Sequence, residues 1–170
     1  MNSLFMVMLG GRHPRANTEV HDVVMAVGHE LTELYPQLKA KWFGAAKGLH
    51  IDAWMNIQGF SQEGKHYRVE LSHVALGKDA ERLYMVNLGG YDQQEFGELH
   101  RYVLVKAAHS KMAKQLGKKA YAQQWQKPHV DHVIDVDDCI KIEMVGDYYV
   151  HVLQSDNTLE NTWENTYITL

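Results

Sequence analysis

One stretch of sequence, LFMVMLGG at residues 4–11, returns at residues 83–90 as LYMVNLGG. Six of the eight positions are identical, and Phe5 against Tyr84 is a conservative change. The same register pairs two further segments: Glu19-Val20-His21 with Glu98-Leu99-His100, and His50-Ile51-Asp52 with His129-Val130-Asp131. Three matches in one register without a gap favour an internal duplication.

Each copy has the pattern of a strand, a helix and two further strands. The apolar runs end in two glycines, which is typical of a buried strand with a tight exit. Over residues 20–38, valines and leucines recur at spacings of three, four and seven, which predicts an amphipathic helix interrupted by Pro36. Further strands are predicted at 49–57 and 66–74 in the first copy, and at 130–136 and 148–154 in the second, with a short helix over 137–143.

These elements predict one α+β domain over residues 1–170. Its repeats, at 3–77 and 82–154, are duplicated βαββ units related by a pseudo-twofold axis, forming a mixed sheet with the helices packed on one face. The alternative is two small sheets packed back to back. Neither half, at about 80 residues, is expected to be stable alone, so we expect a shared core. Residues 155–170 form either a tail or an edge strand.

Composition restricts the classes of partner and the cellular location. A net charge of −4 argues against nucleic-acid binding, because no basic face of the needed size is available. The single cysteine, Cys139, excludes an intramolecular disulfide and is typical of a reducing compartment. The apolar run at 4–9 is too short for a secretory signal, and no run approaches the roughly 20 residues of a membrane helix. We therefore expect a cytoplasmic protein with no membrane segment.

Several short motifs together resemble a known family. They are Leu-Gly-Gly at 9–11, Glu-Val-His-Asp at 19–22, His-Ile-Asp-Ala-Trp at 50–54, Leu-Gly-Gly-Tyr at 88–91, His-Val-Asp at 129–131 and Val-Asp-Asp at 136–138. The combination is similar to a bacterial family known as domain of unknown function 1543, and it extends from about residue 3 to residue 145. The resemblance implies a duplicated βαββ fold, and it implies no activity.

Two Glu-x-His motifs, Glu19/His21 and Glu98/His100, are candidates for binding or acid–base chemistry. The predicted helices place both in a first turn, where the helix dipole favours a carboxylate and a neutral imidazole. One interpretation makes His21 and His100 ligands or acid–base groups held by the adjacent carboxylates. In the other, the glutamate caps the helix and the histidine is a structural residue beneath the loop.

Two His-x-Asp motifs, His50/Asp52 and His129/Asp131, fall on predicted strands. Residues i and i+2 of a strand share a face, so each pair can converge on one point. Imidazole and carboxylate together suit Zn, Mn or Fe, and with His21 and His100 they predict a metal site near the pseudo-twofold axis. The alternative is a His–Asp hydrogen bond that fixes the start of the strand.

The segment that follows the first apolar run is a candidate anion site. Gly10, Gly11, Arg12 and Arg15 precede the predicted helix, so free N–H groups, the helix dipole and two guanidinium groups would point the same way. The equivalent segment after Gly90 is acidic, and a solvated turn is the alternative. Nucleophilic catalysis is disfavoured, because acidic neighbours of Cys139 are expected to raise its pKa.

Two functions from different classes follow. The first is a cytoplasmic binding or interaction module, expected to be a homodimer, with a small anionic ligand at the Arg12/Arg15 loop. The second is a metal-dependent enzyme of hydrolase type that uses the Glu-x-His and His-x-Asp motifs. The sequence identifies no cofactor and leaves open whether the protein is an enzyme.

Overall fold

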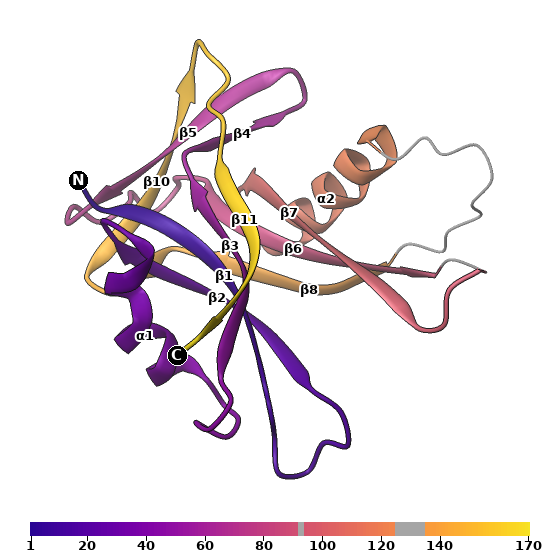
Figure 1. The fold of residues 1–170 in the computed structure, drawn as a ribbon. Helices are drawn as coiled ribbons and strands as arrows, with labels where there is room; N and C mark the ends of the chain where they lie inside the picture. The colour runs from indigo at the N-terminus through magenta and orange to yellow at the C-terminus, as the bar shows by residue number, and fades with distance from the viewer. Residues whose placement is uncertain (92–93, 125–134) are drawn as a thin grey trace.

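The computed structural model describes residues 1–91, 94–124 and 135–170, which are mostly strands with two short α-helices (Figure 1). In chain order the elements are β1 (Ser3–Gly11), β2 (Val20–Gly28), a 3-10 turn η1 (Leu31–Leu34), α1 (Tyr35–Lys41), β3 (His50–Ile57), β4 (Gly59–Gln62), β5 (Lys65–Ser72), β6 (Arg82–Tyr91), β7 (Glu98–Ala107), α2 (Ser110–Gln124), β8 (Asp135–Ile142), β9 (Met144–Val145), β10 (Tyr148–Ser155) and β11 (Thr162–Thr169). The structure is therefore an α+β or mainly-β fold, with few helical residues. Neither described helix is long and apolar enough to cross a bilayer.

The strands form three sheets. Sheet A has the order β11-β3-β1-β2, sheet B has β4-β5-β10-β9, and sheet C has β7-β6-β8. Every strand pairing among the described residues is antiparallel, so the expected mixed sheet is wrong. The reason is that the short segment 12–19 joins β1 to β2 as a hairpin, whereas a parallel pair requires a long crossover.

The helix predicted over residues 20–38 is also wrong for its first half, because Val20–Gly28 is strand β2. This strand is covered on both faces: Val24 packs in the cluster that includes α1, while Val23 and Met25 pack against the central core. A strand buried on both faces loses the alternation of apolar and polar residues, and its valines then match a helical stripe by accident. The helix begins only at Tyr35, with Pro36 in its first turn, where proline is favoured.

The second copy differs from the prediction in the same way. Its expected helix is strand β7 followed by α2, and the short helix expected over 137–143 is part of strand β8. Of the strand predicted at 130–136, residues 130–134 lie outside the described part of the chain.

The core has three clusters, and each helix covers a different sheet. The central cluster lies between the sheets and receives Leu4 from β1, Leu83 from β6 and Val150 from β10. On the other face of β1, Val7 packs in the cluster with α1, and on the other face of β6, Val86 packs in the cluster with α2. Figure 1 shows α1 beside sheet A and α2 beside sheet C, so the helices do not share one face.

Two pairings join distant parts of the chain. Strand β5 pairs with β10, so sheet B is built from both halves of the sequence. The C-terminal strand β11 pairs with β3 and forms an edge of sheet A. Sheets A, B and C therefore all contribute residues to the central core.

A glutamine amide blocks one outer strand of sheet A, β2, and another blocks one outer strand of sheet C, β7. On β2, Gln37 accepts a hydrogen bond from the Val27 N–H at 3.2 Å and donates one to the Val27 carbonyl at 2.7 Å. On β7, Gln62 accepts from the Lys106 N–H at 2.8 Å and donates to the Lys106 carbonyl at 3.1 Å. The two glutamines satisfy backbone groups that an edge strand would otherwise present to solvent.

Candidate metal centre

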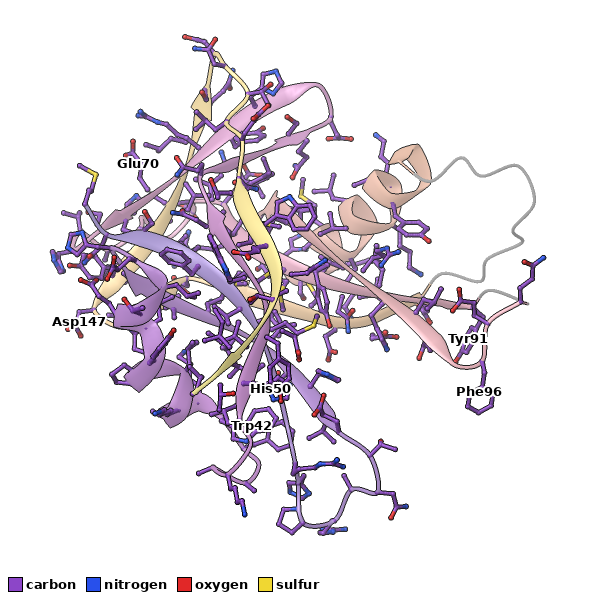
Figure 2. All side chains as sticks on the ribbon, viewed as in Figure 1. Trp42, His50, Glu70, Tyr91, Phe96 and Asp147 are labelled. Carbon is purple, nitrogen blue, oxygen red and sulfur yellow. The ribbon has the colours of Figure 1, made fainter. Side chains whose placement is uncertain are left out.

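Gly10 is the centre of the candidate site. It lies on the interior strand β1, between β2 and β3, and is directly opposite His21 on β2 and His50 on β3. Side chains that are opposite each other across strands project from the same face, and Gly10 has none to fill the space between them. Figure 2 places His50 at the same end of the molecule as Trp42.

Two carboxylates complete the cluster. The pairing of β1 with β3 shifts register between Met8 and Leu9, which leaves Asp52 as an extra residue in a bulge beside His50. Glu19 immediately precedes β2 and is close in sequence to His21. Asp52 Oδ1 lies 3.2 Å from His50 Nε2, and Asp52 Oδ2 lies 3.3 Å from His21 Nε2. Glu19 Oε1 lies 3.5 Å from each of these two nitrogens.

The orientation of His50 is fixed by its other nitrogen. The Nδ1 atom lies 2.9 Å from the Gly48 carbonyl, which can only accept, so Nδ1 carries a proton and donates it. In the neutral ring, Nε2 then holds a lone pair that points at the carboxylates. The His50 side chain is 1% exposed, and neither Nε2 nor Asp52 Oδ2 has a hydrogen-bond partner among the described residues.

The site has a buried side and a solvent side. The ring of Tyr167, on β11, stacks on the His50 ring with centroids 4.2 Å apart. In contrast, the His21 and Glu19 side chains are 49% and 41% exposed. A bound ion would thus be held from the interior by His50 and remain open to water from the other side.

Gly10 is required sterically. A methyl group at this position would overlap Asp52 Oδ2 and lie 2.5 Å from His50 Nε2. The backbone at Gly10 is not in the left-handed region, so the glycine is explained by this space and not by its φ angle.

Sheet C contains a related but more exposed cluster. Gly89 lies opposite His100 and Asp135, and His100 Nδ1 is 3.0 Å from Asp137 Oδ2. Glu98 Oε1 and both Asp137 oxygens would lie within 2.7 Å of a methyl group on Gly89. The position of His50 is taken here by Asp135, which instead forms an ion pair with Lys118 at 3.0 Å. Within the described ranges, no buried imidazole contributes to this second group.

The structure brings some of the predicted metal ligands together and separates others. His21, His50 and Asp52 meet around Gly10, and Glu19 joins them. His100 belongs to sheet C and to the separate cluster, while His129 and Asp131 lie outside the described residues. Both Glu-x-His motifs lie at or in strands, so the expected support from helix dipoles is wrong.

Asp137 is the counterpart of Asp52, and the comparison of the two repeats missed it. In the register of the repeated apolar runs, Asp52 corresponds to Asp131, but the bulge in β8 places Asp137 where β3 has Asp52. A gapped comparison, matching His50-Ile51-Asp52 with Asp135-Val136-Asp137, is the signal that would have found it.

The structure does not contain the helix N-terminus on which the predicted anion site partly depended. Gly10 and Gly11 are inside β1, and the following segment leads into β2 and not into a helix. Arg12 and Arg15 are exposed, and neither forms an ion pair with a residue that the structure describes. Cys139 is partly buried, and burial, rather than acidic neighbours, raises the pKa of its thiol.

Comparison with known proteins gives a fold but no activity. Residues 16–71, which include all four residues around Gly10, match the family model described as Domain of Unknown Function (DUF1543), confirming the resemblance over that part of the chain. The chain is similar to the protein Il1583 from Idiomarina loihiensis, whose crystal structure aligns with a TM-score of 0.71 at 29% identity, covering 99% of this chain and 97% of that one. No curated protein sequence matches the chain.

Proposed function

We propose that this chain, whose matched family has no known function, binds a divalent transition-metal ion at Glu19, His50 and Asp52, with His21 beside them as a further ligand. The buried Nε2 atom of His50 carries the proposal, because it faces two carboxylates and has no hydrogen bond to any described residue. Carboxylate oxygens only accept, so a neutral His50 and its neighbours would bring acceptor against acceptor. A buried polar atom without a partner is destabilising, and a cation would remove the conflict.

The distances between the possible ligands suit such an ion. A tetrahedral site with metal–ligand bonds of about 2.0–2.1 Å has ligand atoms about 3.3–3.4 Å apart. His50 Nε2 lies 3.2 Å from Asp52 Oδ1 and 3.5 Å from Glu19 Oε1, and these three residues each offer a ligand atom within 4.8 Å of the other two. His21 lies outside that group, with its Nε2 3.3 Å from the other Asp52 oxygen. Two imidazoles with two carboxylates suit Zn²⁺, Mn²⁺ or Fe²⁺. The competing explanation is a protonated His50 that forms an ion pair with the carboxylates.

Elemental analysis of untagged protein, purified without chelators or added metal, tests the proposal. We expect about one equivalent of metal per chain, or uptake of one Co²⁺ with a visible absorption band, and loss of both in His50→Ala. The matched control is His151→Ala, because the His151 ring lies away from the cluster, with Nε2 2.8 Å from the Val74 carbonyl. Protein that contains no metal and takes up no Co²⁺ would favour the protonated histidine.

A metal-dependent hydrolase is the second candidate. The solvent-facing side of the cluster, where His21 and Glu19 are exposed, supports it, because a hydrolytic metal needs an open position for water. A bound Zn²⁺ lowers the pKa of such a water to about 7, which supplies hydroxide at neutral pH. Turnover of activated esters or phosphoesters that is lost in His50→Ala is the evidence this candidate requires.

The anion-binding proposal for the loop of Gly10, Gly11, Arg12 and Arg15 rests on its two exposed arginines. We expect phosphate to raise the melting temperature of the native chain, because a ligand that binds only the folded state stabilises it. Reversing both charges, in Arg12→Glu/Arg15→Glu, should make the rise smaller. The same rise in the double variant would contradict a site at this loop.

Duplication, dimerisation and a cytoplasmic location are further proposals. Duplication is supported by the register shifts at Met8/Leu9 in sheet A and Asn87/Leu88 in sheet C, which fall at the same point of the repeated apolar run. A homodimer is supported by Trp163 and Tyr167, which are 61% and 69% exposed on the edge strand β11. Sedimentation of the native protein measures the mass of the particle in solution, and so distinguishes a dimer from a monomer.

A further inference from the structure

Helix α2 concentrates positive charge in an acidic protein. Its sequence, SKMAKQLGKKAYAQQ, has four lysines and no aspartate or glutamate, whereas the whole chain has a net charge of −4. Lys111, Lys114 and Lys118 recur at spacings of three and four, which places them along one face of the helix.

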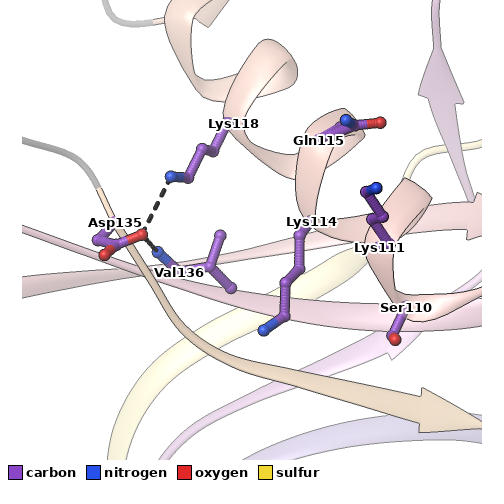
Figure 3. Close-up of a pocket in the computed structure, with 7 residues that line it drawn as sticks. All are labelled: Ser110, Lys111, Lys114, Gln115, Lys118, Asp135 and Val136. Carbon is purple, nitrogen blue, oxygen red and sulfur yellow. Dashed lines mark hydrogen bonds and ion pairs between the residues drawn. The ribbon is translucent and has the colours of Figure 1, made fainter.

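This face borders a hollow of about 420 Å³ between α2 and the start of β8 (Figure 3). The hollow is lined by Ser110, Lys111, Lys114, Gln115, Lys118, Asp135 and Val136. Figure 3 shows the side chains of Lys114 and Lys118 extending from the helix toward β8. The volume is within the range of about 300–1,000 Å³ that is typical of small-molecule sites.

The charges around the hollow do not balance. Lys118 forms an ion pair with Asp135 at 3.0 Å, and neither Lys111 nor Lys114 forms an ion pair with any described residue. Three ammonium groups against one carboxylate leave two positive charges. The pKa of Asp135 lies below its ordinary value, chiefly because Lys118 donates a hydrogen bond to it, and the charge of Lys114 contributes.

Two backbone amides in the first turn of α2 already have partners within the chain. The Met112 N–H donates to His109 Nδ1, and the Ala113 N–H donates to the His109 carbonyl. Lys111 and Lys114 are therefore the cationic donors of the lining that form no ion pair with a described residue, and ammonium groups bind phosphate oxygens as mobile point charges.

We propose that the hollow between α2 and β8 binds a small molecule that carries a dianionic group, such as a phosphate or phosphate ester. Two unpaired ammonium groups match the two negative charges of the ligand, and the apolar stems of the lysines with Val136 accommodate the part that carries the group. This site involves none of the residues around Gly10, so it does not depend on the metal centre.

A titration of ¹⁵N-labelled protein with phenyl phosphate, followed by NMR, tests the proposal. We expect saturable shifts of the amides at 110–118 and 135–136, with affinity reduced at least about tenfold in Lys111→Gln/Lys114→Gln as two charge-assisted contacts are lost. The control is Lys119→Gln, which removes a charge from the same helix but from a lysine that pairs with Glu63.

Three results would overturn the proposal. The first is the absence of saturable shifts in the native chain. The second is an equal loss of affinity in Lys119→Gln, which would indicate a general charge effect. The third is a set of shifts confined to residues 12–16, which would assign the anion to the arginine loop instead.

Discussion

The change Gly10→Ala is expected to weaken metal binding by at least about 100-fold, more than the loss of a supporting contact around a metal site. The added methyl group would occupy the space between His50 Nε2 and Asp52 Oδ2, where the ion is proposed to lie. Alanine is compatible with the backbone there, so the effect is steric. Titration with Co²⁺, followed by its visible absorption, measures the change in affinity.

The control for this change is Gly77→Ala, because a methyl group at Gly77 meets no atom within 4 Å and its backbone is likewise not left-handed. A second variant, Asp52→Asn, keeps the volume of the side chain and removes its charge. If Gly10→Ala retains the affinity of the native chain while remaining folded, the ion cannot lie above Gly10. If it fails to fold, Asp52→Asn still tests the ligand set.

The change Leu9→Ala is expected to lower the free energy of unfolding by about 2–5 kcal/mol, which is the usual result of truncating a buried leucine. Leu9 is 0% exposed on β1, an interior strand of sheet A, and packs in the cluster that includes Leu38 and Trp42. In a chain of 170 residues the melting temperature should fall by about 4–20 °C. Denaturant unfolding and thermal unfolding measure the two quantities.

Leu153→Ala is the matched comparison for Leu9→Ala. Leu153 is on β10, but its side chain is 36% exposed, so the same truncation removes less buried surface and should lower stability by less than about 1 kcal/mol. Equal losses in the two variants would show that the apolar face of β1 does not form a core with α1.

The sequence predicts those elements whose pattern is local. Alternation over 50–57 and the paired glycines after the apolar runs are sufficient for β3, β1 and β6, because each strand has distinguishable faces or a clear end. Strand β2 could not be recognised from its own residues. Its conformation is set by pairing with β1 on one side and by burial under α1 and against the central core, which are contacts with distant residues.

The candidate site was likewise predicted only where the pattern was local. The spacing of His50 and Asp52 correctly predicts a shared face, but their meeting with His21 depends on a register across Gly10 that no local pattern contains. The residues of the second cluster, in sheet C, were predicted incorrectly for another reason. The connection from β7 to β8, residues 108–134, is six residues longer than the connection from β2 to β3, residues 29–49. The gapless comparison therefore assigned His129 and Asp131 to positions that Asp135 and Asp137 occupy.

The glutamine amides on Val27 and Lys106 have a consequence for how this protein meets copies of itself. An unprotected edge strand can recruit a strand from another molecule, and repeated recruitment leads to fibrils or exchanged hairpins. Gln37 and Gln62 occupy backbone groups that an incoming strand would need, on β2 of sheet A and on β7 of sheet C. Uncontrolled polymerisation through β2 and β7 is therefore hindered, whereas the dimer proposed above would use a different edge, β11.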